Sequence, residues 1–226
     1  MTFSFKTALS ALVSVLLIVV AISPLAAGDV IHYTLGIPNN ALSIYPAPYA
    51  DLTVNRTDST HATITFDSLS TGGFTYLFMA AQVADVNVNA SSWLIGSFFE
   101  TNPPGFSHTV LSDGGAGNVS SFGHFNQTTD NFDGFSHAAE EVGFILTNTG
   151  GTWSDAGSVL TPNNDGFLAA IHVGVCEEGH CTPDLGALTT GFAGNGGGNG
   201  GVPEPASLVL LGSGLLAVGR LLRGRK

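Results

Sequence analysis

The amino-acid sequence predicts an all-β fold, a single β-sandwich of the jelly-roll or immunoglobulin-like type, placed between an apolar helix at each end of the chain. Three observations favour this fold class. Short segments that alternate polar and apolar residues recur along the middle of the chain, turn-forming residues separate them, and almost no amphipathic helical pattern occurs between them. We therefore expect roughly eight short strands.

The clearest strand signals are a pair of alternating segments separated by "DST", which predict a β-hairpin over residues 50–57 and 61–69. Residues 74–88 are long enough for one strand or for two with a bend. Further strands are expected at 91–99, 141–149 and 166–176, with turns at "NPPG", "SDGGAGN", "NTGG" and "PNNDG". The apolar phase of these segments predicts the core residues Phe66, Phe74, Phe78, Trp93, Phe144, Leu146, Leu168 and Ile171.

The N-terminal segment, residues 1–28, is typical of a secretory signal peptide. Lys6 precedes an apolar run over residues 8–20, and small residues follow up to Gly28. A retained membrane anchor and a buried core helix are the alternatives. We expect export by the Sec translocase and cleavage by signal peptidase, so that the mature chain begins near Asp29.

The C-terminal segment, residues 202–226, has three parts. The first is Val202, Pro203, Glu204 and Pro205, in which the prolines favour an extended backbone and leave the glutamate presented. An uncharged apolar run from 206 to 218 follows. A helix from 206 to 222, which includes Arg220, would be roughly 25 Å long, and this length is marginal for a permanent anchor. The third part is a basic stop that favours a cytoplasmic end, consisting of Arg220, Arg223, Arg225 and Lys226. Residues 191–201, rich in Gly and Asn, predict a flexible linker before the segment.

This order of parts resembles the PEP-CTERM sorting signal, a resemblance that covers the last 25 residues and leaves the domain at 29–190 unrecognised. It implies export across the inner membrane of a Gram-negative-type bacterium and transient anchoring there. An exosortase, a membrane cysteine protease or transpeptidase, is then expected to cut at or near the motif. The resemblance also implies a place at the cell surface or in the extracellular matrix, linked to exopolysaccharide and biofilm. Unrelated domains carry the same signal, so it predicts an address and not an activity.

The charge of the central domain is strongly negative. Five of the six basic residues lie in the end segments, which leaves Arg56, whereas only Glu204 among the 17 acidic residues lies outside the domain. Nucleic acid and anionic membrane surfaces are poor partners for such a field. Divalent cations and weakly charged polymers are compatible with it, and solubility of a secreted protein is the simplest explanation.

The two cysteines, Cys176 and Cys181, stand close together in "CEEGHC". In an exported chain this spacing predicts a disulfide that closes a short loop. The alternative is a metal site that adds His180, with His172 as a further candidate ligand, to the two sulfurs.

The region from Ser112 to His137 holds the best ligand-binding candidates, because carboxylates, amides and imidazoles alternate there with four phenylalanines. Such side chains suit sugar rings and hydroxyls, and the oxygens suit calcium. The calcium candidates are Asp113, Asp130 and Asp133, although neither "DGGAGNVSS" nor "DNFDGF" has the ligand spacing of a known calcium loop. The alternative is structural, with phenylalanines in the core and Asp and Asn in turns. The tetrapeptide "GFSH" occurs twice, at 105–108 and 134–137, but its flanks differ, which favours coincidence over a repeat.

No enzyme signature stands out: "GxSxG" is absent outside the tail, and "HExxH" is absent altogether. Glu140 and Glu141 are adjacent, so on a strand they point to opposite faces and do not form a catalytic pair. We therefore expect a non-catalytic surface or matrix protein without a cofactor. The alternatives are a secreted carbohydrate- or calcium-binding module and a secreted hydrolase in which distant carboxylates meet.

Overall fold

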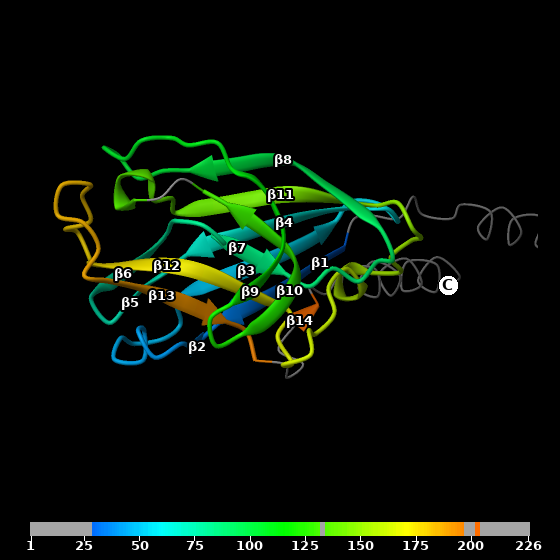
Figure 1. Cartoon of the computed structure of the whole chain (residues 1–226), viewed down its shortest axis with the longest axis horizontal. Helices are drawn as coiled ribbons and strands as arrows, with labels where there is room; N and C mark the ends of the chain where they lie inside the picture. The colour runs from blue at the N-terminus through cyan, green and yellow to red at the C-terminus, as the bar shows by residue number, and fades with distance from the viewer. Residues whose placement is uncertain (1–28, 132–133, 197–201, 204–226) are drawn as a thin grey trace, which may run out of the picture.

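The computed structural model describes residues 29–131, 134–196 and 202–203, which form two antiparallel β-sheets packed face to face (Figure 1). The predicted all-β sandwich is confirmed at this level. The narrower types, jelly-roll and immunoglobulin-like, stay predictions.

The first sheet contains six of the strands. These are β1 (Asp29–Leu35), β3 (Ala50–Arg56), β4 (His61–Ser68), β8 (Trp93–Thr101), β11 (Glu141–Asn148) and β14 (Val202–Pro203). Their spatial order is β14-β1-β3-β4-β11-β8. The expected hairpin is present as β3 and β4, whose register pairs Leu52 with Phe66 and Val54 with Ile64.

The second sheet contains eight strands and carries β9 and β10 at one edge. These strands are β2 (Ile37–Pro38), β5 (Ser70–Thr71), β6 (Phe74–Phe78), β7 (Ala84–Val86), β9 (Ser112–Val119), β10 (Gly123–Asp130), β12 (Ala169–Glu177) and β13 (Thr189–Gly194). The main order is β2-β13-β12-β7-β10-β9, and β6 also pairs with β12. Residues 74–88 therefore form two strands, β6 and β7, that share one edge of β12. Two short 3-10 helices, η1 (Phe135–His137) and η2 (Ala156–Ser158), lie in the connections.

The core lies between the sheets because successive strand residues alternate between the two faces. In β3 every second residue is buried, from Ala50 to Arg56. Five of the predicted core residues are 1% exposed or less, namely Phe66, Phe78, Phe144, Leu146 and Ile171. Phe74, Trp93 and Leu168 are half-buried and pack against the same core.

Two sequence predictions about the chain's irregular parts are wrong. The glycine-rich "SDGGAGN", expected as a turn, lies in strand β9, because it pairs with β10. Residues 191–194, expected as the start of the linker, belong to β13 and pair with Ala170–Val173 of β12. The side-chain oxygen of Asn195 then accepts hydrogen bonds from the backbone of Leu168 and Ala169. The folded domain thus extends past residue 190.

Candidate functional site

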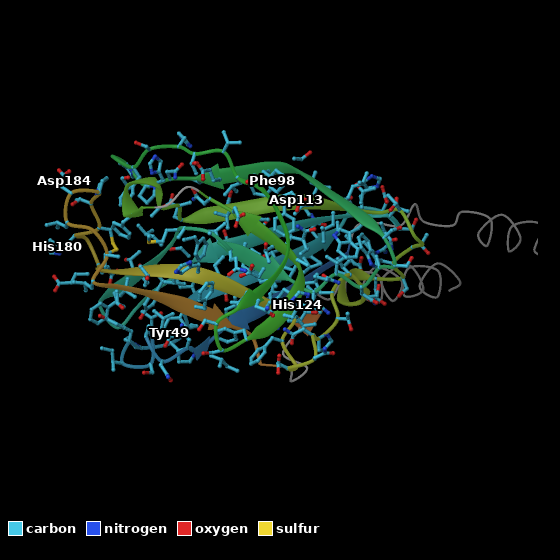
Figure 2. All side chains as sticks on the ribbon, in the orientation of Figure 1. Tyr49, Phe98, Asp113, His124, His180 and Asp184 are labelled. Atoms are coloured by element: carbon cyan, nitrogen blue, oxygen red, sulfur yellow. A yellow bond between two sulfur atoms is a disulfide. The ribbon has the colours of Figure 1, made fainter. Side chains whose placement is uncertain are left out.

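The Ser112–His137 region forms the β9–β10 hairpin and the segment after it, with Asp113 and His124 on the hairpin (Figure 2). Three of its phenylalanines, Phe122, Phe125 and Phe135, are at most 8% exposed. Buried rings offer no flat face to a sugar, so the predicted aromatic platform is absent for these three. Phe132 lies outside the described residues.

The two calcium candidates that the structure describes, Asp113 and Asp130, do not converge on one point. Asp113 lies opposite Thr129 in the ladder, whereas Asp130 is the next residue along β10 and faces the other side. Asp113 accepts hydrogen bonds from Gly115 and Gln127, and Asp130 accepts one from the backbone of Gln82. Asp133 lies outside the described residues.

The other polar side chains of the region serve the fold. Asn126 uses both ends of its amide to bind the backbone of Val88. Asn131 is buried and donates a hydrogen bond to the carbonyl of His137, while Asn118 and His124 are exposed. This favours the structural interpretation of the region over the ligand-binding one.

The two cysteines form the predicted disulfide. Cys176 at the end of β12 bonds to Cys181 with their Cα atoms 5.3 Å apart. The bridge closes a surface loop that contains His180, and Asp184 follows shortly after it (Figure 2). Because both sulfurs are bonded to each other, the metal alternative loses its ligands in this state.

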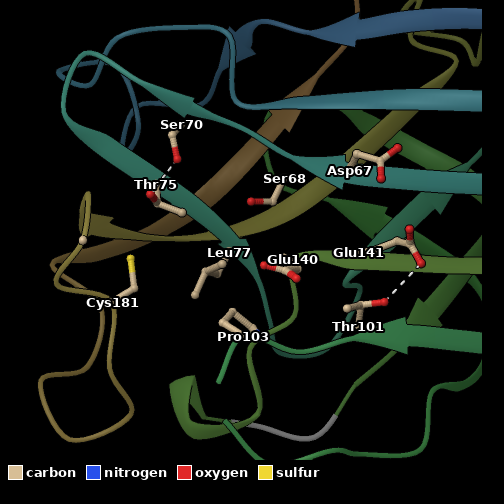
Figure 3. A pocket seen from close by; sticks show the side chains of 11 residues that line it. Asp67, Ser68, Ser70, Thr75, Leu77, Thr101, Pro103, Glu140, Glu141 and Cys181 are labelled. Atoms are coloured by element: carbon tan, nitrogen blue, oxygen red, sulfur yellow. Dashed lines mark hydrogen bonds between the residues drawn. The ribbon is translucent and has the colours of Figure 1, made fainter. Parts of the chain in front are cut away.

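The structure reveals a candidate site that the sequence did not indicate, an acidic cleft of about 540 Å³ near this disulfide (Figure 3). Its lining includes three carboxylates, from Asp67, Glu140 and Glu141, together with hydroxyl groups of Ser68, Thr75 and Thr101. Because Glu140 and Glu141 are adjacent, we expected their side chains to point to opposite faces of a strand. Both nevertheless border this cleft.

The carboxylates of the cleft continue a row across the first sheet. Asp51, Asp67 and Glu141 lie directly opposite one another on β3, β4 and β11. Burial, followed by the negative charges of Glu141 and Asp51, raises the pKa of Asp67. Thr101 donates a hydrogen bond of 3.3 Å to Glu141. The register of the predicted β3–β4 hairpin could have placed Asp51 beside Asp67, but the partner strand β11 could not be assigned from sequence.

This arrangement suits hydrogen bonding to sugar hydroxyls, or proton transfer by a carboxyl with a raised pKa. Within the described residues, no three His, Cys, Asp or Glu side chains are grouped so that they could hold a metal ion.

The C-terminal tail is the part of the chain that was expected to direct sorting. Its first described residues, Val202 and Pro203, are extended and pair with His32 and Ile31 of β1. Residues 201–226 match the PEP-CTERM protein-sorting motif. The chain carries a PEP-CTERM sorting signal. Proteins with this signal are exported, are substrates of an exosortase and are sorted to the cell surface.

The match covers only the PEP-CTERM tail and none of the sandwich. No curated protein matches the chain, and neither does any solved structure. The predicted signal peptide, Glu204, Pro205 and the basic stop all lie outside the described residues. Among the residues that are described, no helix is long and apolar enough to cross a membrane.

Proposed function

We propose that this protein is a non-catalytic component of the cell surface or extracellular matrix, associated with exopolysaccharide. After export it is held briefly in the inner membrane by its C-terminal helix, and an exosortase then cleaves it at or near Val202–Pro205. The match of residues 201–226 to the PEP-CTERM motif carries this proposal.

The way the domain is closed before its tail supports the proposal, because cleavage at the motif removes at most the two-residue edge strand β14 from the described sandwich. β13 ends at Gly194. The side-chain oxygen of Asn195 then accepts hydrogen bonds from the backbone of Leu168 and Ala169, at the start of β12. Within the described residues, the tail adds only the pairing of Val202 and Pro203 with β1.

The N-terminal end supports signal-peptide cleavage at or before Asp29. One oxygen of Asp29 accepts a hydrogen bond of 2.7 Å from Arg56, and the other accepts one from the backbone of Ala156. These bonds tie the start of β1 to β3 and η2. A mature chain that begins at Asp29 keeps all of them.

The test compares wild type, Glu204→Ala and Glu178→Ala in the native host, by fractionation and intact mass. Glu178 is an exposed acid in the disulfide loop, so its variant controls for loss of a charge. We expect wild type and Glu178→Ala to reach the cell surface without the residues that follow the cut, up to Lys226. Glu204→Ala should keep Lys226 and stay in the membrane. A Glu204→Ala protein processed like wild type would remove the basis of the proposal.

The acidic cleft favours a second candidate function, that of a secreted glycoside hydrolase. Asp67, with its raised pKa, would donate a proton and Glu141 would act as base or nucleophile. Incubation of the protein with the host's own extracellular polysaccharide tests it. Release of reducing ends by wild type, but not by Asp67→Asn, would support the hydrolase. No release by wild type supports the non-catalytic role.

A further inference from the structure

A second depression lies at the other end of β11 from the acidic cleft. It is a groove of about 630 Å³, formed mainly by residues 87–91 and by the connection that follows β11, from 148 to 161. Glu141 and Asn148 are the first and last residues of β11, so the cleft and the groove are roughly 23 Å apart.

The groove differs from the acidic cleft in carrying no charge. The described residues that line it are mostly Asn, Ser, Thr and Gly, and none of them is ionisable. The surrounding domain contains a single basic residue, Arg56, and almost all of the chain's acidic residues. The groove is therefore a neutral hydrogen-bonding surface within an acidic molecule.

Trp153 fixes the two sides of the groove to each other. Its indole nitrogen donates a hydrogen bond of 2.8 Å to the carbonyl of Asn89, and its backbone nitrogen donates one to Ser59. The side chain is only 2% exposed, so it supports the groove from beneath and leaves polar groups to form the surface.

Three asparagines are held so that one end of each amide stays available. Asn87 and Asn89 donate through their side-chain nitrogens to the carbonyls of Thr161 and Ser158. Asn148 accepts from the backbone of Gly150 through its side-chain oxygen. The amide oxygens of Asn87 and Asn89 and the amide nitrogen of Asn148 make no hydrogen bond within the described residues. Two acceptors and a donor group are thus fixed before any ligand arrives, which lowers the entropic cost of binding.

This set of groups matches the hydroxyls of a sugar, each of which both donates and accepts hydrogen bonds. An anionic polymer would meet the repulsion of the acidic domain, and Arg56 is committed to Asp29. A neutral polymer meets no such barrier.

We propose that this groove binds an uncharged polysaccharide chain. The inference rests on the proposed function, because it names the matrix component that the processed protein would contact. It also moves the carbohydrate site away from the described phenylalanines of the Ser112–His137 region, which are buried, although Asn126 of that region borders the groove.

Two glycines allow a clean test. A Cβ added at Gly151 has only the side-chain oxygen of Asn148 within 4 Å, at 4.0 Å, so Gly151→Leu would fill open groove space. Gly36, outside the groove, has nothing within 4 Å of an added Cβ. Neither glycine has the positive φ that disfavours other residues, so Gly36→Leu is a matched control. Thermal unfolding of both variants checks that the fold is kept.

The probe is the host's extracellular polysaccharide, separated by anion exchange into a neutral and an acidic fraction. The full chain is kept soluble in a detergent without a sugar headgroup, so that the result does not depend on sorting. Affinity electrophoresis should show that the neutral fraction retards wild type and Gly36→Leu equally, while Gly151→Leu binds about tenfold or more weakly. Because the groove is uncharged, retardation should also change little with salt.

Three results would overturn the inference: no retardation of wild type by the neutral fraction, equal retardation of Gly151→Leu, or stronger retardation by the acidic fraction. If Glu204→Ala behaves as expected while the neutral fraction does not bind, only the groove assignment fails. If the neutral fraction binds while Glu204→Ala is processed normally, only the sorting proposal fails.

Discussion

Asp85 in the centre of β7 is the most unusual residue of the domain. It is fully buried, and neither of its carboxylate oxygens has a hydrogen-bond partner within the described structure. Its strand neighbours are Thr128 on one side and Ala170 on the other, neither of which carries a charge. Burial and then the charge of Asp130 raise the pKa of Asp85 well above its usual range. Folding therefore favours the neutral form of this carboxyl over the ionised form.

Replacing Asp85 with Asn should make the protein's stability less sensitive to pH. From about pH 4 upward the unfolded chain releases a proton that the folded chain keeps, so wild-type stability falls as the pH rises. The loss relative to Asp85→Asn should be ~1.4 kcal/mol per pH unit until the folded carboxyl ionises. Urea denaturation between pH 4 and pH 8 measures the difference. Asp184→Asn, in an exposed loop, should show no such trend, and a constant gap between wild type and Asp85→Asn would contradict the account.

At the scale of elements, the sequence predicts strands well where their side chains alternate. β3, β4 and β11 begin and end within two residues of the expected bounds, because period-two burial is a local signal. β9 has no such signal. Its glycines instead permit close packing, since a Cβ at Gly114 would lie 2.5 Å from the hydroxyl of Thr128 and one at Gly117 would clash with the amide of Gln82. β9 therefore forms because of its contacts with other strands, whereas its glycine-rich composition alone is typical of a turn.

The repeated "GFSH" also has a role that sequence did not reveal. The rings of Phe106 and Phe135 pack edge to face with centroids 5.4 Å apart, and the backbone nitrogen of Ser107 donates to the carbonyl of Ser136. The two copies thus meet in one small cluster beside Cys176.

The disulfide between Cys176 and Cys181 should stabilise the domain measurably. It closes a loop of sequence separation 5, for which loop-closure entropy gives about 2 kcal/mol. Adding a reductant should lower the free energy of unfolding of wild type by this amount in urea titrations. The double variant Cys176→Ala/Cys181→Ala should not respond to reductant. An unchanged wild type, with both thiols shown to be free, would contradict the prediction.

At the scale of the whole molecule, sequence alone predicts the cellular destination of the protein better than it predicts the acidic cleft and the neutral groove. The tail is read from contiguous residues, so its three parts are visible without a structure. The acidic cleft needs the register of β3, β4 and β11, which brings Asp67 and Glu141 together across many intervening residues. The neutral groove depends on the hydrogen bond from Trp153 to the carbonyl of Asn89, which is 64 residues away in sequence. Neither could be assembled from local patterns.

Exosortase cleavage between the sandwich and its tail is tested by the intact mass of the protein from two host strains. In the parent strain we predict a surface species that begins near Asp29 and ends at or near Val202–Pro205. In a strain that lacks the exosortase, the protein should keep Lys226 and remain in the inner membrane. The same mass and the same location in both strains would contradict the account.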